Sequence, residues 1–286
     1  MSNIDWFNES LLIEPASKQI QVHDKTINYL VWGEESKPGL FFIHGYSAHA
    51  HWWDFVAPAF IEKFCVVAID LSGSGDSDHR ESYSQEIFAD EIKAVCEDMN
   101  WKQADFVAHS MGGSISLNAT SIYPELFKSL TLLDSIVVLP PDKVRGFSSN
   151  KSMIRADFIY DDKDAAMDSF RLIPPQPCRN DYLLKHIASN SFKQRDDGWV
   201  LKSDGKIMKS YKSKDLTDIL MAIKCPINIV YGLMSQIFIQ EILDYTLYVG
   251  NIPEERVIGV PGTMHHLFVD DPLSVIDALK KLIGED

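Results

Sequence analysis

The stretch Ala104-Asp-Phe-Val-Ala-His-Ser-Met-Gly-Gly113 contains a short apolar run, then a serine, then two glycines. The run has the length and residue types of a buried strand, and the residues after Ser110 begin a helical pattern. Small residues stand two positions before and two positions after the serine, at Ala108 and Gly112. A chain that turns directly from a strand into a helix needs small residues there, because larger side chains would collide. The stretch therefore predicts a strand and a helix that are joined by a very tight turn.

The alternation of apolar run and helical pattern continues on both sides of this stretch. Such runs are apolar on both faces, which is typical of a parallel sheet covered by helices. Helical spacing lines up Phe88, Ile92, Val95 and Met99, and the same spacing recurs near the C-terminus. We therefore predict an α/β fold, a mostly parallel central sheet with helices on both faces. The expected strands are Gly39–His44, Cys65–Asp70, Ala104–His109, Leu130–Asp134, Ile227–Gly232 and Val257–Pro261, preceded by a hairpin within Ile20–Trp32.

The strand and helix rhythm breaks between about residues 135 and 223. This segment contains Pro140-Pro141, Pro174-Pro175 and Pro177, acidic clusters and short amphipathic pieces, but no clear strand. It is too long and too apolar for a plain linker. We therefore expect a core made of residues 1–135 and 224–286, with residues 136–223 inserted as a helical cap.

Composition limits the partners of this chain. The 286 residues are 45% hydrophobic and 24% charged, as in ordinary globular proteins. Lys and Arg number 27 against 41 Asp and Glu, which gives a net charge of −14. A chain so acidic lacks the positive field that binds nucleic acid or an anionic membrane surface. We therefore expect a small-molecule substrate, with neither nucleic acid nor membrane as partner.

The sequence also favours a cytoplasmic protein. Its first residues form no signal peptide, and no run approaches the roughly 18 apolar residues of a membrane helix. The four cysteines are scattered and form no Cys-x-x-Cys pair, so reduced thiols are expected rather than a disulfide framework or a zinc site. They are Cys65, Cys96, Cys178 and Cys225.

Ser110 is the first candidate for chemistry. A serine on this turn stands clear of the chain at a helix N-terminus, where the helix dipole favours developing negative charge. The backbone N–H of Met111 would then point at a forming oxyanion. The structural alternative is a Ser-Gly helix cap after a strand, which a short motif does not exclude.

Three further stretches, together with this turn, resemble the α/β-hydrolase fold superfamily. They are His44-Gly45, Asp70-Leu-Ser-Gly-Ser-Gly-Asp-Ser77 and Val260-Pro-Gly-Thr-Met-His-His-Leu-Phe-Val-Asp-Asp-Pro272. The resemblance implies that Ser110 is a nucleophile and that the Tyr46 amide is a second oxyanion donor beside Met111. In this superfamily the catalytic histidine commonly precedes a proline by seven residues, which selects His265 as the base and leaves His266 as the alternative.

The acid departs from the commonest pattern of that superfamily. The loop after Ile227–Gly232 carries Ser235 where many members have an aspartate. The other position used in the superfamily is the end of the earlier strand, where Asp134 stands 24 residues after Ser110. A strand-end aspartate can also simply cap a helix. We expect Asp134 to be the acid, with Glu241 and Asp244 as the remaining candidates.

The resemblance implies a serine hydrolase. We expect a carboxylesterase that cleaves small to medium acyl esters through an acyl-serine intermediate. One alternative is a C–C bond hydrolase of meta-cleavage products from aromatic ring fission, with esterase activity beside it. Another is a non-catalytic ligand receptor on a hydrolase fold. A serine at position 110 argues against dehalogenase and epoxide hydrolase relatives, which need a carboxylate nucleophile.

Several residues are candidates for contact with a substrate, each with a plainer structural role as the alternative. Tryptophans pack loops onto cores, and surface arginines are usually solvated. Arg195 is a further arginine of the insertion that could bind a substrate carboxylate. The cluster His49-Ala-His51 with Asp54 superficially suggests a metal site, but its spacing is wrong for the usual metallo-hydrolase motif, so we expect neither metal nor cofactor. The candidates for substrate contact are His44, Trp53, His109, Arg171, Arg179 and His266.

Overall fold

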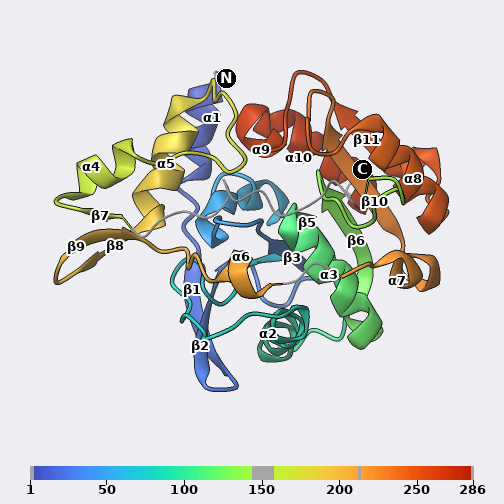
Figure 1. Cartoon of the computed structure of the whole chain (residues 1–286), viewed down its shortest axis with the longest axis horizontal. Helices are drawn as coiled ribbons and strands as arrows, with labels where there is room; N and C mark the ends of the chain where they lie inside the picture. Colours follow the sequence, from blue (N-terminus) through green and yellow to red (C-terminus); the bar gives the residue numbers. More distant parts are fainter. Residues whose placement is uncertain (1–2, 144–157, 212–213, 285–286) are drawn as a thin grey trace.

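The predicted apolar runs form one eight-stranded sheet in the computed structural model, which describes residues 3–143, 158–211 and 214–284 (Figure 1). Its spatial order is β1-β2-β4-β3-β5-β6-β10-β11. The six strands from β4 to β11 in this order run parallel, whereas the hairpin β1-β2 pairs antiparallel within itself and with β4. The strands are β1 (Ala16–Val22), β2 (Lys25–Trp32), β3 (Gly39–Ile43), β4 (Cys65–Ile69), β5 (Ala104–His109), β6 (Phe127–Leu133), β10 (Ile227–Gly232) and β11 (Val257–Val260).

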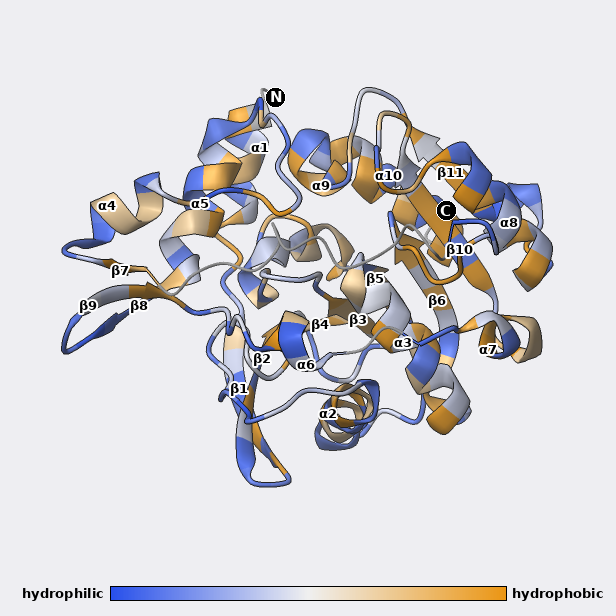
Figure 2. Cartoon of the chain, in the orientation of Figure 1, coloured by the Kyte–Doolittle hydropathy of each residue, from blue (hydrophilic) through white to orange (hydrophobic). Residues whose placement is uncertain are grey.

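Alternate residues of the central strands enter two separate hydrophobic cores, one on each face of the sheet. Phe41 belongs to the core beneath α2, α3 and α8, while its neighbour Phe42 belongs to the core beneath α1 and α10. Figure 2 shows α5 and α8 with both orange and blue along the ribbon, as expected for helices with one buried side. The α/β fold is therefore the predicted one. The helices of the core are α1 (Asn3–Ser10), α2 (Gln85–Asp98), α3 (Met111–Ile122), α8 (Gln240–Gly250), α9 (Leu267–Asp270) and α10 (Pro272–Ile283), with 3-10 turns at Ala50–Trp53, Ala57–Phe60, Pro124–Leu126 and Glu254–Arg256.

The inserted segment carries a second, small sheet that the sequence did not predict. Its three antiparallel strands lie in the order β7-β9-β8. These strands are two to four residues long, too short for an alternating pattern to stand out from the flanking polar residues. Figure 1 places them beside α4 and α5, on the side of the molecule away from β11. The elements of the segment are β7 (Ile159–Tyr160), α4 (Lys163–Asp168), α5 (Asp181–Ser191), β8 (Phe192–Arg195), β9 (Gly198–Leu201), α6 (Ile207–Ser210) and α7 (Thr217–Ala222).

The topology brings the ends of three strands to one edge of the sheet. Ser110 follows β5, Asp134 follows β6, and His265 lies on the loop after β11. Because parallel strands point the same way, their carboxyl ends meet at this edge, where α/β proteins hold their ligands. Among the described residues, every helix is too short or too polar to cross a bilayer.

Candidate active site

The turn at Ser110 is tight and its backbone is strained, as the small residues around it predict. Ser110 has φ 54° and ψ −120°, a left-handed conformation that side chains rarely adopt. A Cβ atom on Gly112 would lie 2.6 Å from the carbonyl oxygen of His44, so no larger residue fits there. The turn leaves the Ser110 side chain half-buried at the N-terminus of α3. Such strain is typical of functional positions.

A continuous chain of hydrogen bonds joins Ser110, His265 and Asp134. His265 Nε2 lies 3.0 Å from Ser110 Oγ, and His265 Nδ1 lies 2.8 Å from Asp134 Oδ1. The Asp134 carboxylate is fully buried. The structure thus brings together the three side chains that the sequence selected, in the order hydroxyl, imidazole, carboxylate.

Asp134 is held by two further donors. The backbone N–H of Gly232 donates to Oδ2 at 3.0 Å, and the Ser235 hydroxyl donates to Oδ1 at 2.8 Å. The other candidate acids lie elsewhere: Glu241 is exposed and pairs with Lys143 at 2.6 Å, and Asp244, also exposed, accepts a hydrogen bond from its neighbour Gln240. Neither of these two carboxylates contacts His265. Ser235 stands where many members of the superfamily carry their acid, and here it donates a hydrogen bond to the acid at Asp134.

The loop at Gly45 lies directly against the nucleophile. A Cβ atom on Gly45 would be 3.0 Å from the Ser110 Cβ, so the backbone approaches as closely as glycine allows. The buried His44 holds this loop: its Nδ1 donates to the Gly45 carbonyl at 2.7 Å, and its Nε2 accepts from the Leu71 amide at 3.1 Å. Burial lowers the pKa of His44. Both nitrogens of His44 are thus engaged with backbone groups, which leaves neither for a substrate.

Two neutral histidines flank His265. Burial, together with the nearby His265, lowers the pKa of both His109 and His266 well below the usual value. The His109 Nε2–H donates to the His265 carbonyl at 3.0 Å, so this side chain fixes the backbone of the His265 loop. Neither histidine carries charge at neutral pH.

Sequence reasoning missed the polar contacts that anchor the His265 loop to the inserted segment. Gln176 accepts a hydrogen bond from the His266 amide at 3.0 Å and donates to both carboxylate oxygens of Asp270, each at 3.0 Å. Asp270 also accepts from the Met264 amide at 2.7 Å, and Asn180 donates to the Val269 carbonyl at 2.8 Å. An isolated Gln between prolines, or an Asn just after them, carries no local signal that relates it to a loop about 90 residues away.

The other residues predicted to contact a substrate are either buried in the core or exposed on the inserted segment. Trp53 is fully buried, with ring centroids 4.8 Å from Phe42 and 4.7 Å from Phe268, as in the packing alternative. Arg171 is exposed and donates to backbone carbonyls of its own segment, and Arg179 is exposed. Arg195 lies in β8 and pairs with Asp197 at 2.9 Å.

The histidine cluster after the Gly45 loop surrounds a carboxylate rather than an ion site. Asp54 Oδ2 accepts from His51 Nδ1 at 2.9 Å and from His186 Nε2, which belongs to α5, at 2.8 Å. His49 instead contacts the Ser191 hydroxyl at 2.9 Å. In the part of the chain that the structure describes, no group of three His, Cys, Asp or Glu side chains is arranged to hold a metal ion.

Comparison with known proteins gives the same fold. The α/β-hydrolase fold family model matches residues 38–164. A serine hydrolase-like protein of Danio rerio is 25% identical over 189 residues, which are 62% of this chain and 58% of that relative, so the match spans little more than half of the relative.

Solved structures match over nearly the whole chain. An E-2-(acetamidomethylene)succinate hydrolase has a TM-score of 0.81 at 21% identity, covering 94% of this chain and 99% of its own. An esterase of Mycobacterium tuberculosis has a TM-score of 0.76 at 22% identity, covering 99% of both chains. At such identities the likeness concerns the fold alone. Together with the family model, it shows that the chain has the α/β-hydrolase fold.

Proposed function

We propose that this protein is a serine hydrolase, a carboxylesterase that cleaves small to medium acyl esters through an acyl-serine intermediate. The observation that carries this proposal is the hydrogen-bonded chain from Ser110 Oγ through His265 to the buried Asp134. Hydroxyl, imidazole and carboxylate in this order are what nucleophilic catalysis by serine requires.

Each group has a separate task in the proposed mechanism. Ser110 Oγ attacks the ester carbonyl carbon while His265 Nε2 takes its proton, and the Asp134 carboxylate stabilises the imidazolium. The amides of Met111 and Tyr46 donate to the tetrahedral oxyanion. His265 then returns the proton to the leaving alcohol, which departs as the acyl-serine forms. A water molecule, deprotonated by His265, hydrolyses the acyl-serine and frees Ser110.

We also propose that residues 136–223 act as a cap over this site. Gln176 and Asn180 of the segment contact the loop that carries His265, and His186 of α5 contacts Asp54 near the Gly45 loop. These contacts, with the His265 loop and with the segment that follows the Gly45 loop, support an insertion that covers the site and selects the substrate.

The test is hydrolysis of p-nitrophenyl acetate and butyrate by the purified protein. We expect many turnovers per serine, and we expect Ser110→Ala to abolish them. Ser114→Ala is the matched control, because Ser114 lies on the same helix and its hydroxyl contacts the Met111 carbonyl and Tyr211, not His265. Labelling of Ser110 without turnover would favour a ligand receptor. Activity confined to a ring-fission product would favour the C–C bond hydrolase.

A further inference from the structure

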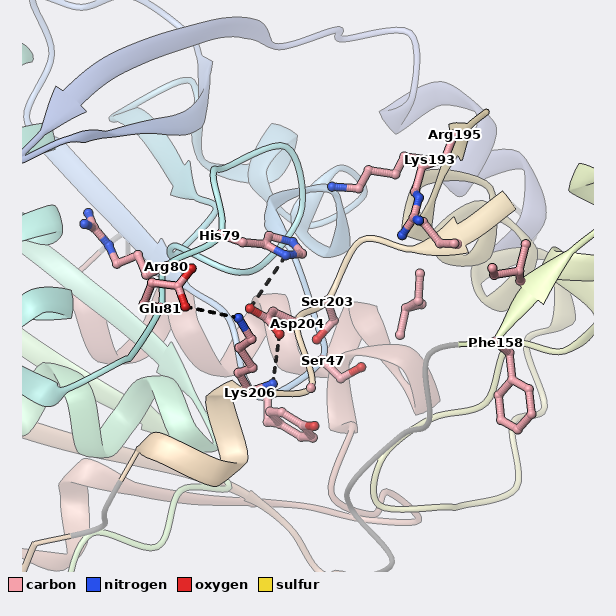
Figure 3. A pocket seen from close by; sticks show the side chains of 15 residues that line it. Ser47, His79, Arg80, Glu81, Phe158, Lys193, Arg195, Ser203, Asp204 and Lys206 are labelled. Atoms are coloured by element: carbon pink, nitrogen blue, oxygen red, sulfur yellow. Dashed lines mark hydrogen bonds and ion pairs between the residues drawn. The ribbon is translucent and has the colours of Figure 1, made fainter. Parts of the chain in front are cut away.

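A pocket of about 540 Å³ opens beside the Gly45 loop, between the core and the inserted segment (Figure 3). Tyr46 and Ser47 line it from the core, and β8 and β9 line it from the insertion. Ser110 does not line this pocket, but Tyr46 directly follows Gly45, whose backbone lies against Ser110. The pocket therefore lies beside the proposed reaction centre, on the side of Tyr46. The pocket has the volume of ordinary small-molecule sites.

The charges around the pocket are unevenly compensated. Arg80 lies 3.0 Å from the buried Glu91, and His79 lies 3.6 Å from Asp204, so these two groups have carboxylate partners. Lys206 and Glu81, 3.5 Å apart, are both exposed to solvent. Lys193, in contrast, has no carboxylate partner among the described residues. Its neighbour on the strand, Arg195, shares its charge only with Asp197, in a pair where both side chains are about half exposed. Solvent screens such a pair strongly.

Lys193 and Arg195 form one cationic rim. They are two positions apart on β8, so their side chains leave the strand on the same face. Figure 3 draws both on the same side of the pocket, opposite Glu81 and Lys206. In a chain of net charge −14, such a rim is a local exception to the overall field.

The remaining wall is apolar and open to solvent. Phe158 is 64% exposed and Ile159 is 51% exposed, and Val200 and Leu201 stand beside them in the lining. Large apolar side chains left exposed in a concave surface are typical of ligand sites. The wall offers an apolar surface against which an aliphatic stem can pack.

We infer that this pocket binds the anionic end of an ester or thioester substrate. The apolar stem packs along Phe158 and Ile159, and a terminal carboxylate or phosphate reaches Lys193 and Arg195. The inference rests on the proposed function, because it takes Ser110 as the point of attack. It adds the substrate class: an acyl compound with a negative charge remote from the scissile bond.

The first experiment compares mono-p-nitrophenyl adipate with its neutral methyl ester. We expect the wild-type protein to prefer the anionic ester in kcat/KM, and this preference to weaken at high salt. The double variant Lys193→Gln/Arg195→Gln should lower kcat/KM for the anionic ester roughly three- to tenfold, the range of two screened surface charges, and leave the neutral ester unchanged. Lys185→Gln/Lys224→Gln is the matched control, since both lysines are exposed and lie outside the pocket.

A second substrate pair identifies the source of the charge. S-acetyl-4′-phosphopantetheine and S-acetylpantetheine differ only by a phosphate on the leaving group, whereas the adipate pair differs by a carboxylate on the acyl group. A preference that depends on Lys193 and Arg195 in either pair supports the inference. No charge preference in both pairs, or a preference that survives the double variant, overturns it.

A binding measurement separates this inference from the proposed function. If no ester is hydrolysed, the proposed function fails, and calorimetric titration with monomethyl adipate and dimethyl adipate decides the inference alone. Tighter binding of the monoester that is lost in Lys193→Gln/Arg195→Gln supports an anion subsite. Equal binding of the two compounds overturns it.

Discussion

The Asp134 carboxylate accepts hydrogen bonds from three donors, His265 on the loop after β11, Gly232 at the end of β10 and Ser235 just after that strand. If it stabilises the imidazolium, Asp134→Asn keeps the shape of the site but removes the charge. We expect kcat for p-nitrophenyl butyrate to fall by about 10⁴-fold, as in other triads. Glu241→Gln and Asp244→Asn should retain wild-type rates. An inactive Glu241→Gln variant together with an active Asp134→Asn variant would refute the assignment of Asp134 as the catalytic acid.

A substitution at Ser235 tests whether His265 needs a carboxylate beside it. Its Oγ lies 2.8 Å from Asp134 Oδ1, which itself lies 2.8 Å from His265 Nδ1. An aspartate at 235 extends one bond further toward the imidazole. We therefore expect Asp134→Asn/Ser235→Asp to recover at least about tenfold of the kcat lost in Asp134→Asn, a gain of about 1.4 kcal/mol in transition-state stabilisation. A double variant no faster than the single one would show that position 235 cannot present a carboxylate to His265.

The sequence predicted the site residues that stand in short motifs and missed those that depend on contacts between distant segments. Ser110 and His265 stand in short motifs whose spacing is set by one tight turn or one loop. Asp134 required elimination, because a strand-end aspartate has several roles. Gln176 had no signal, since its importance comes from contacts with His266 and Asp270 that exist only once the insertion folds back on the core.

At the scale of elements, Gln176 fastens the inserted segment to the His265 loop. Removing the side chain in Gln176→Ala deletes the acceptor for the His266 amide and the donors to Asp270. We expect a loss of kcat of about 10- to 100-fold, because small displacements of a catalytic group are costly. KM for a small ester should change little. Gln194→Ala, at an exposed position of β8, is the control and should behave as wild type; equal losses in both variants would contradict a positioning role.

His51 and His186 both contact the Asp54 carboxylate, and the pH dependence of this cluster comes from His51 and Asp54. Burial alone would lower the pKa of His51, but the hydrogen bond and charge of Asp54 outweigh burial and raise it. Burial alone would raise the pKa of Asp54, but the hydrogen bonds from His186 and His51 outweigh burial and lower it. Stability from the raised histidine pKa is complete below about pH 6.5 and is lost as the pH rises through the folded value. Stability from the lowered aspartate pKa is present above about pH 3.9 and is lost as the pH falls through the folded value.

Both contributions therefore coincide between about pH 4 and pH 6.5. We expect Asp54→Asn to reduce the free energy of unfolding more at pH 5.5 than at pH 8.5, as measured by urea denaturation at each pH. Asp181→Asn, an exposed change on α5, should show no such difference. An equal loss at both pH values for Asp54→Asn would mean that charge on His51 is not involved.

Burial explains which strands the sequence could predict. The apolar strands β3, β4 and β5 have five or six residues and are buried throughout, so composition alone marks them. The strands β7, β8 and β9 hold two to four residues and pair only with one another, and their stability depends on tertiary packing that no local pattern records.

At the scale of the whole molecule, buried side chains of the inserted segment join the two cores of the large sheet. Ile207, Leu216 and Leu220 pack in the cluster beneath α2 and α3, on one face of the large sheet. Leu183 and Ile187 of α5 pack in the cluster on the other face. The segment thus contributes side chains to both hydrophobic cores.

This sharing predicts that the inserted segment and the sheet unfold together. Leu183 is fully buried in α5, so Leu183→Ala removes methyl groups and leaves a cavity, at a cost of about 2 to 5 kcal/mol. We expect Leu183→Ala to unfold in a single transition at a lower urea concentration than the wild type. Far-UV ellipticity and esterase activity should be lost together in that transition. Met221→Ala changes a side chain that is 68% exposed and should stay within about 0.5 kcal/mol of wild type. If activity disappears at a lower urea concentration than ellipticity, the segment unfolds by itself, and its contacts with the two cores are too weak to couple it to the sheet.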